Sequence, residues 1–189
     1  MKKTIYLLLV FSISQNSFSQ DIKSVEKSIF SVQTGILGFW TSNEARLTNS
    51  IALHSEIGLE AGFFGGEMRS RNTFLLAPVI TLEPRWYYNL EKRASKSKNV
   101  KNNGASFVTA SINYYPDGFV ISNNSNVIVY DQVAIIPKWG MRRNIGNSNF
   151  NYELGAGLGY RKIFLKKYGY AENKSEATLD LHIRIGYTF

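Results

Sequence analysis

Apolar and polar residues alternate along most of the chain beyond residue 28. In the segment 177–189 every odd position is Ala, Leu, Ile, Tyr or Phe, and every even position is polar or Gly. A period of two predicts a β-strand with one apolar and one polar face, and this strand is longer than most strands of globular proteins. The same alternation predicts further strands at 51–63, 76–88, 108–115, 132–142 and 150–161, and a weaker one at 30–40.

Polar segments rich in Gly, Asn, Asp and Lys separate these strands, near 64–72, 90–104, 116–126, 144–149 and 165–176. Seven strands are evident, but single-chain bacterial barrels have even numbers of strands. We therefore predict an eighth, short strand at 43–47, between a connection at 41–42 and a tight turn at 48–49. The expected fold is all-β, a single antiparallel up-and-down transmembrane β-barrel of eight strands. Both termini and the connections at 48–49, 90–104 and 144–149 then lie at its periplasmic end.

Three prolines lie inside predicted strands, at Pro78, Pro84 and Pro137. Proline lacks the N–H that a strand donates to its neighbour. We therefore expect bulges at these positions, or strands shorter than the alternation suggests.

The direction of the apolar face separates two kinds of barrel. A soluble eight-stranded barrel, such as a lipocalin, also alternates, but its apolar face points inward. Here many glycines share the polar face, where they would leave room for large neighbours in a lumen only just wide enough for side chains. Aromatic residues near strand ends on the apolar face are typical of an interfacial girdle. The predicted girdle comprises Trp40, Trp86, Tyr88, Trp139, Tyr187 and Phe189.

The N-terminal residues have the layout of a secretory signal peptide. Lys2 and Lys3 precede an apolar run at 5–13, and Ser17-Phe18-Ser19 provides small residues before Gln20. The run is too short to span a bilayer as a helix. We expect a signal peptide at 1–19, a short lead at 20–28 and the barrel at 29–189.

The chain ends Ile183-Arg184-Ile185-Gly186-Tyr187-Thr188-Phe189. A terminal Phe after alternating apolar residues resembles the insertion signal of outer-membrane barrels. Together with the signal peptide, residues 28–189 resemble the small eight-stranded β-barrels of the OmpX/OmpA-like superfamily. The resemblance implies a location in the bacterial outer membrane, no cofactor, and recognition of Phe189 by the barrel-assembly machinery. Members of the family differ in function, so it implies no specific activity.

The polar face supplies the candidate site. Unpaired charges in a narrow lumen are costly, so Glu and Arg are expected to pair across strands. The predicted ion-pair cluster comprises Glu56, Glu83, Arg85, Glu153 and Arg184. Further polar side chains expected in the lumen are His54, Glu60, Lys138, Arg142, Arg161, Asp180 and His182. With no Cys and only two His, the chain offers little for a metal site, and we expect none.

Four function classes follow, and a filled barrel with a structural or surface-interaction role is the leading one. A small pore is the second, but eight strands leave no open channel. A lipid-modifying enzyme is the third: Asp180 and His182 share a face, but no Ser motif accompanies them. A soluble lipocalin-like periplasmic carrier is the fourth.

Part of the net charge of +8 comes from basic residues in one connection. Lys92, Arg93, Lys96, Lys98 and Lys101 could meet an anionic polymer or lipid headgroups, or form a solvated turn. They lack interleaved aromatics, which argues against nucleic acid. Lys166 and Lys167 lie near the expected outer rim. The expected partners are therefore outer-membrane lipid and lipopolysaccharide, and we expect a monomer.

Overall fold

The computed structural model describes residues 23–36, 38–61, 75–123 and 128–189. The predicted signal peptide at 1–19 lies outside these residues. Eight long strands are present: β1 (Ser28–Gly35), β2 (Gly38–Arg46), β3 (Ile51–Ala61), β4 (Leu75–Trp86), β5 (Ser106–Tyr115), β7 (Gln132–Asn144), β8 (Phe150–Ile163) and β9 (Lys174–Thr188). The shorter elements are the two-residue strand β6 (Ile121–Ser122), the helix α2 (Leu90–Ala94) and the 3₁₀ turns η1 (Lys101–Asn103) and η2 (Leu165–Tyr168).

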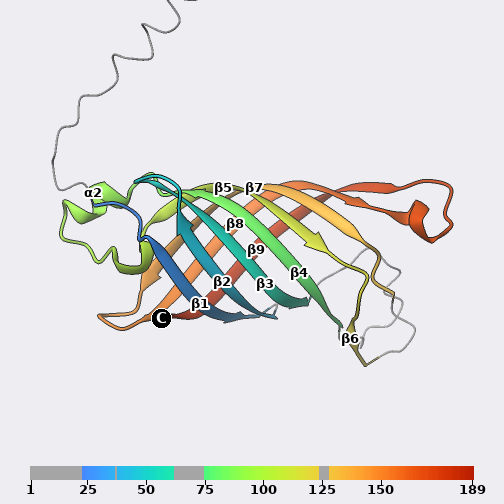
Figure 1. The fold of residues 1–189 in the computed structure, drawn as a ribbon, viewed down its shortest axis with the longest axis horizontal. Coiled ribbons are helices and arrows are strands. Elements are labelled where there is room, and N and C mark those ends of the chain that lie inside the picture. Colours follow the sequence, from blue (N-terminus) through green and yellow to red (C-terminus); the bar gives the residue numbers. More distant parts are fainter. Residues whose placement is uncertain (1–22, 37, 62–74, 124–127) are drawn as a thin grey trace, which may run out of the picture.

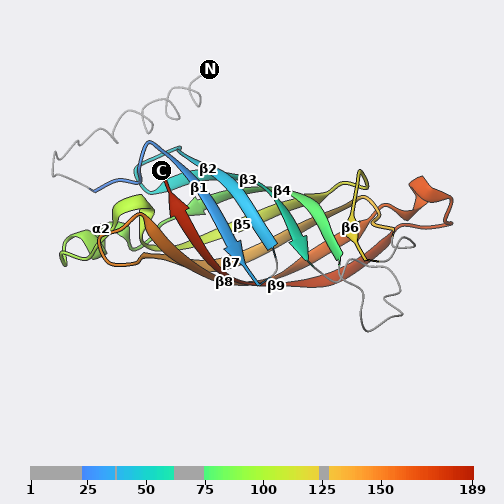
Figure 2. The ribbon, with the colours of Figure 1, turned by 90° about the horizontal axis from the view of Figure 1, so that it is seen from below.

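The eight long strands form a closed antiparallel barrel (Figures 1 and 2). Hydrogen-bonded neighbours follow the order β3-β2-β1-β9-β8-β7-β5-β4, and the pairing of β3 with β4 closes the ring. The added strand β6 pairs only with the start of β4, at Leu75 and Leu76. The prediction of an all-β, eight-stranded antiparallel barrel is confirmed, with β6 as one extra strand.

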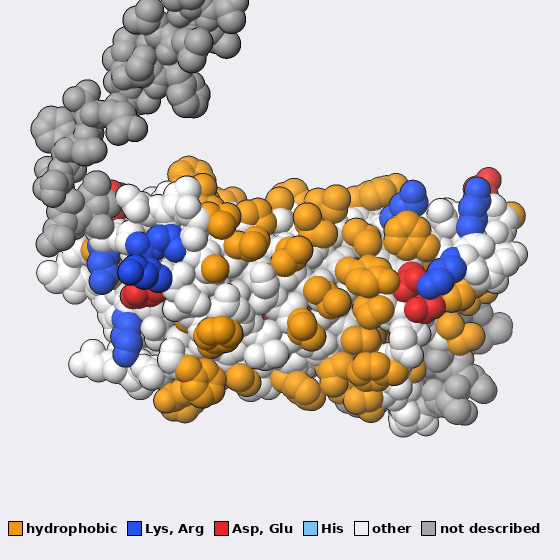
Figure 3. All heavy atoms as spheres, in the orientation of Figure 1, with side chains coloured by type: hydrophobic (Ala, Val, Ile, Leu, Met, Phe, Trp, Pro, Cys, Tyr) orange, Lys and Arg blue, Asp and Glu red, His pale blue; other side chains and the backbone are white. Residues whose placement is uncertain are grey.

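The barrel has its apolar side chains outside and its polar side chains inside. On β9, Leu181 and Ile183 are 58% and 60% exposed, whereas Arg184 is 8% exposed. Figure 3 shows apolar side chains spread over the middle of the visible face, with Lys, Arg, Asp and Glu gathered towards its two ends. Alternation along each strand therefore places apolar side chains on the outer wall and charged side chains in the interior.

The connections fall into two groups. The C-terminus, the 47–50 and 145–149 turns and the segment 87–105 lie at the end marked by α2, here the α2 end (Figure 1). The opposite end, here the β6 end, carries the described residues of the 116–123, 128–131 and 164–173 connections. The described connections group as predicted, and the connection predicted at 64–72 lies outside the described residues. The turn of the first hairpin, predicted at 41–42, lies earlier in the chain. Gly35 pairs with Gly38, so β2 already begins at Gly38 and the expected short strand at 43–47 is its second half.

The strand prolines interrupt pairing without bulges or shortened strands, which corrects our prediction. β4 keeps one register with β5, from Ile80–Tyr114 to Trp86–Val108, although positions 83–85 are unpaired around Pro84. β7 and β8 likewise lose pairs only at 136–137, beside Pro137. In both cases the other neighbour pairs without a break, because a strand residue directs its N–H to one side only.

The segment 87–105 closes the α2 end of the lumen. Tyr87, Leu90, Ala105 and Phe107 form a small apolar core together with Ala52 and with Val25 of the N-terminal lead. Asn102 and Asn103 of η1 are also buried. No helix in the described part of the chain is long and apolar enough to cross a membrane.

Candidate functional site: the charged lumen

Glycines on the inner face make room for the large side chains of the lumen. A Cβ at Gly58 would collide with the Trp40 ring, and one at Gly155 would collide with the ring of His182. Trp40 pairs directly with Gly58, and His182 pairs directly with Gly155. An eight-stranded barrel has little interior space, so each bulky inward residue depends on a small residue on the next strand.

Arg85 lies at the centre of the ion-pair cluster. Its Nη1 and Nη2 donate to the two oxygens of Glu153 at 3.1 and 3.0 Å, and its Nε donates to Glu83 at 2.7 Å. Its guanidinium also lies 4.4 Å from the centre of the Phe107 ring. Arg142 shares Glu153, with Nη2 2.9 Å from Oε2. Three members of the predicted cluster, Glu83, Arg85 and Glu153, are thus in direct contact.

Glu44 is the principal residue that the sequence analysis missed. Its Oε2 lies 3.2 Å from Arg142 Nη2 and 3.5 Å from Arg85 Nη1, and Tyr87 donates to its Oε1 at 2.7 Å. Asn103 donates to the same Oε1 and so joins the cap of the α2 end to the lumen. The alternation of the sequence could have identified Glu44 as a lumen residue. Glu44 lies four residues after Trp40 and two after Ser42, and all three side chains share one face of β2.

Glu56 and Arg184 form a second pair, with Arg184 Nη1 2.6 Å from Glu56 Oε2. His54 joins it to Glu44: its Nε2 is 3.3 Å from Glu56 and its Nδ1 is 3.4 Å from Glu44. All five residues of the predicted cluster therefore belong to one network, but Glu56 and Arg184 reach the other three through His54 and Glu44.

Trp40 does not belong to an outer girdle, which corrects our prediction. It is 4% exposed, and the Arg184 guanidinium lies 3.8 Å from the centre of its ring. Its place on β2 explains the error, because the apolar ring was assigned outward at the end of a strand that in fact ends at Gly35. The ring fills the space beside Gly58 and contacts a cation through its π face.

The other residues of the predicted girdle point outward, and several contact one another. Trp139 donates from Nε1 to the Tyr88 hydroxyl at 2.9 Å, and Tyr88 meets Trp86 edge to face. On the C-terminal strand, Tyr187 packs against Phe189 with ring centres 5.2 Å apart. These five side chains are all more than a third exposed.

Lys138 extends the network towards the β6 end. It donates to Glu83, and its Nζ lies 3.1 Å from Asp180. Asp180 Oδ1 is 3.3 Å from His182 Nδ1, while His182 Nε2 faces Glu153 at 3.5 Å. Both ring nitrogens of His182 thus face carboxylate oxygens.

The remaining predicted lumen residues lie nearest the β6 end. Glu60 accepts a hydrogen bond from the Tyr115 hydroxyl at 3.0 Å, and Arg161 pairs with Glu176 on the neighbouring strand. Among the described residues, no three His, Asp or Glu side chains are arranged to hold a metal ion.

The basic 92–101 segment is ordered into α2 and η1 and divides into two sets. Arg93 donates from Nε to the Gly104 carbonyl at 2.9 Å, and Lys101 donates to Asn149 at 2.8 Å, so both hold the cap in place. Lys92, Lys96 and Lys98 are exposed. The second set has no such role in the cap and is available to an external anion.

A separate group of polar side chains, here the loop cluster, joins two connections at the β6 end: Asp117, Asp131, Lys167 and Tyr168. The Tyr168 hydroxyl donates to Asp117 at 2.6 Å, and Lys167 donates to Asp117 at 3.1 Å and also to Asp131. Hydrogen bonds from Tyr168 and Lys167 lower the pKa of Asp117. Hydrogen bonds to Asp131 and Asp117 raise the pKa of Lys167.

No family model, no curated protein and no solved structure matches this chain. The arguments for function therefore come from the residues and their geometry.

Proposed function

We propose that this protein is an integral β-barrel of the bacterial outer membrane, exported by its N-terminal signal peptide, with a filled lumen and a structural or surface-interaction role. The observation that carries the proposal is the inverted distribution of side chains. Leu181, Ile183 and Ile185 of one strand are exposed, and the charged residues between them face inward. In water, such a wall would form a contiguous exposed apolar patch far larger than the patches on ordinary soluble proteins.

The aromatic side chains support the same environment. Trp86, Tyr88, Trp139, Tyr187 and Phe189 point outward, and indole and phenol rings favour the boundary between headgroups and hydrocarbon. Closure of the wall also satisfies the backbone without a free edge along most of its length, as spanning a bilayer requires. Membership of the OmpX/OmpA-like superfamily is part of this proposal.

The filled lumen argues against the alternative of a pore. The cluster of Glu44, Arg85, Arg142 and Glu153 bridges β2, β4, β7 and β8, and the segment 87–105 covers the α2 end. A soluble lipocalin-like carrier would need an apolar interior, but this interior is lined by ion pairs. The carboxylate partners of His182 likewise give no support to the lipid-modifying alternative.

Fractionation combined with gel mobility tests the proposal. The mature protein should enter the outer-membrane fraction, require detergent for extraction and migrate differently before and after boiling. In planar bilayers it should give no sustained channels of regular size. Solubility of the folded protein without detergent would overturn the membrane assignment, and regular channels would overturn the filled lumen.

A further inference from the structure

The seam between β1 and β9 closes only part of the barrel wall. Pairing runs from Ser31–Thr188 to Gly35–Arg184 and then stops, because β1 ends at Gly35. On its other side β9 pairs with β8 as far as Ile163–Lys174. Between Lys174 and Ile183, no strand residue among those described pairs with the β1 side of β9.

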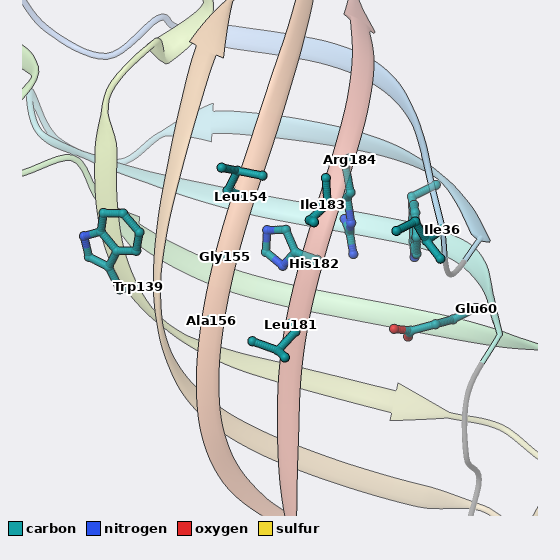
Figure 4. Close-up of a pocket in the computed structure, with 11 residues that line it drawn as sticks. Ile36, Glu60, Trp139, Leu154, Gly155, Ala156, Leu181, His182, Ile183 and Arg184 are labelled. Atoms are coloured by element: carbon teal, nitrogen blue, oxygen red, sulfur yellow. The ribbon is translucent and has the colours of Figure 1, made fainter.

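A cavity of about 500 Å³, which we call the notch, opens beside this unpaired stretch and extends past Leu154 and Ala156 of β8 to Trp139 of β7. Its outer lip is apolar, with Ile36, Leu181 and Ile183, and its floor reaches His182 and Arg184 (Figure 4). Trp40 also lines the floor. Ile36, at the tip of the β1–β2 hairpin, is 82% exposed. The notch therefore connects the apolar outer surface of the wall with the charged lumen.

Three buried N–H donors lie together beneath the notch: Trp40 and Arg184 line its floor, and Gln33 contacts Arg184 behind it. Trp40 Nε1, Arg184 Nε and Gln33 Nε2 have no acceptor among the residues that the structure describes. The three side chains touch in sequence, since Arg184 stacks on Trp40 and donates from Nη1 to Gln33 Oε1 at 3.3 Å. Buried donors without acceptors are costly, so an acceptor that reaches them from the notch gains hydrogen bonds that these donors otherwise lack.

We propose that the notch binds a single-chain amphiphile with a carboxylate head, its alkyl chain along Leu181 and Ile183 and its head at the donors of Trp40 and Arg184, beside Gln33. A carboxylate only accepts hydrogen bonds and offers lone pairs for several donors at once. An alkyl chain matches the apolar lip, and the notch has the volume of a small-molecule site. The inference rests on the proposed function, because a surrounding membrane would supply such amphiphiles to the protein.

The charges around the notch set the strength and selectivity of binding. Glu56 already pairs with Arg184, and Asp180 and Glu153 face His182. Glu60 lines the same opening, with its carboxylate held by Tyr115. An incoming carboxylate shares Arg184 with Glu56 and is opposed by Glu60, so removal of the Glu60 charge should strengthen binding.

Native mass spectrometry of the folded full-length mature chain, released from a non-ionic detergent, tests the inference. Tetradecanoate, its methyl ester and tetradecylamine are offered at equal concentration. We expect the carboxylate to be retained about tenfold more than either analogue, since hydrogen bonds to a charged acceptor are the stronger kind. Equal retention of the three compounds would overturn the proposal, and preference for the amine would too.

Matched variants locate the site. Trp40→Phe removes one donor but keeps the ring under Arg184, and Gln33→Glu places a carboxylate among the donors while keeping the acceptor for Arg184. Both should lower tetradecanoate retention about tenfold, whereas Glu60→Gln should raise it severalfold. Trp86→Phe makes the same chemical change on the outer wall and should alter nothing.

If Trp40→Phe and Gln33→Glu bind like the unsubstituted chain, the notch is not the site. That failure would leave the membrane proposal standing, because the assay uses protein already folded in detergent.

Discussion

Arg85 on β4 and Glu153 on β8, 68 residues apart in the chain, form a two-pronged ion pair across the lumen with N–O distances of 3.1 and 3.0 Å. β5 and β7 lie between their strands in the sheet, so the pair crosses the interior of the barrel and does not follow its wall. The pair therefore depends on closure of the barrel and in turn stabilises the closed form.

Replacement of Glu153 by Ala should destabilise the barrel strongly. The variant leaves Arg85 and Arg142 buried without their shared carboxylate, and breaking a buried pair costs about 3–5 kcal/mol. The free energy of unfolding in urea, measured in detergent or vesicles, checks this. Glu172→Gln removes a carboxylate at an exposed position and should change that free energy little. A loss below about 1 kcal/mol for Glu153→Ala would show that the network is dispensable.

Leu181→Arg distinguishes a lipid-facing wall from a water-facing wall. Leu181 is 58% exposed, so in water the substitution should change stability by only about 0.5 kcal/mol. On the lipid face of a barrel the same change costs about 2–4 kcal/mol near the bilayer midplane. Unfolding of the variant from lipid vesicles measures the difference. A near-neutral result would contradict the membrane assignment.

Asn103→Asp should loosen the cap of the α2 end. Asn103 is fully buried, donates to Glu44 and accepts from the Glu26 amide at 2.8 Å. A carboxylate there would lose the donor and face Glu44 with like charge, for a loss of about 1–3 kcal/mol. Hydrogen exchange of the Glu26 amide should speed up. Asn147→Asp, at an exposed turn position, should leave that amide unchanged.

Gly58→Ala should displace Trp40 and weaken the barrel by about 1–3 kcal/mol, the usual cost of overpacking. The added Cβ would collide with the Trp40 ring and would also lie 2.8 Å from the Phe39 carbonyl oxygen. Intrinsic fluorescence reports the change at Trp40, and urea unfolding reports the stability. Gly118→Ala is the control, because a Cβ there meets no atom within 4 Å. It should change neither the fluorescence nor the free energy of unfolding.

The loop cluster should come apart at both extremes of pH. The lowered pKa of Asp117 means that its contribution is present above its ordinary value of 3.8 and is lost as pH falls through the lower folded value. The raised pKa of Lys167 means that its contribution is present below 10.5 and is lost as pH rises through the higher folded value. Exchange of the Asp117 amide, which donates to Asp131 at 2.9 Å, measures this. Between these limits Lys167→Met should speed that exchange modestly, since Lys167 is exposed and its ion pairs are screened by salt. Exchange that is independent of Lys167 would contradict the role of the ion pairs.

The alternation of period two determined much of this protein without tertiary information. It predicted most of the strands, the grouping of most connections and the inward face that carries Glu83, Arg85 and Glu153, while the eighth strand came from the even strand number of bacterial barrels. These features follow from local geometry, because successive strand residues point to opposite sides of a sheet.

Tertiary structure decided where bulky side chains meet, how the prolines are tolerated and how the α2 end is covered. The inward position of Trp40 depends on Gly58 of the next strand, and the role of Glu44 depends on Arg142 and Asn103, which lie far away in sequence. The extent of the β1–β9 seam likewise arises from two strands at opposite ends of the chain. Periodicity carries no information about such pairs, because closure of the barrel alone brings these residues within contact distance.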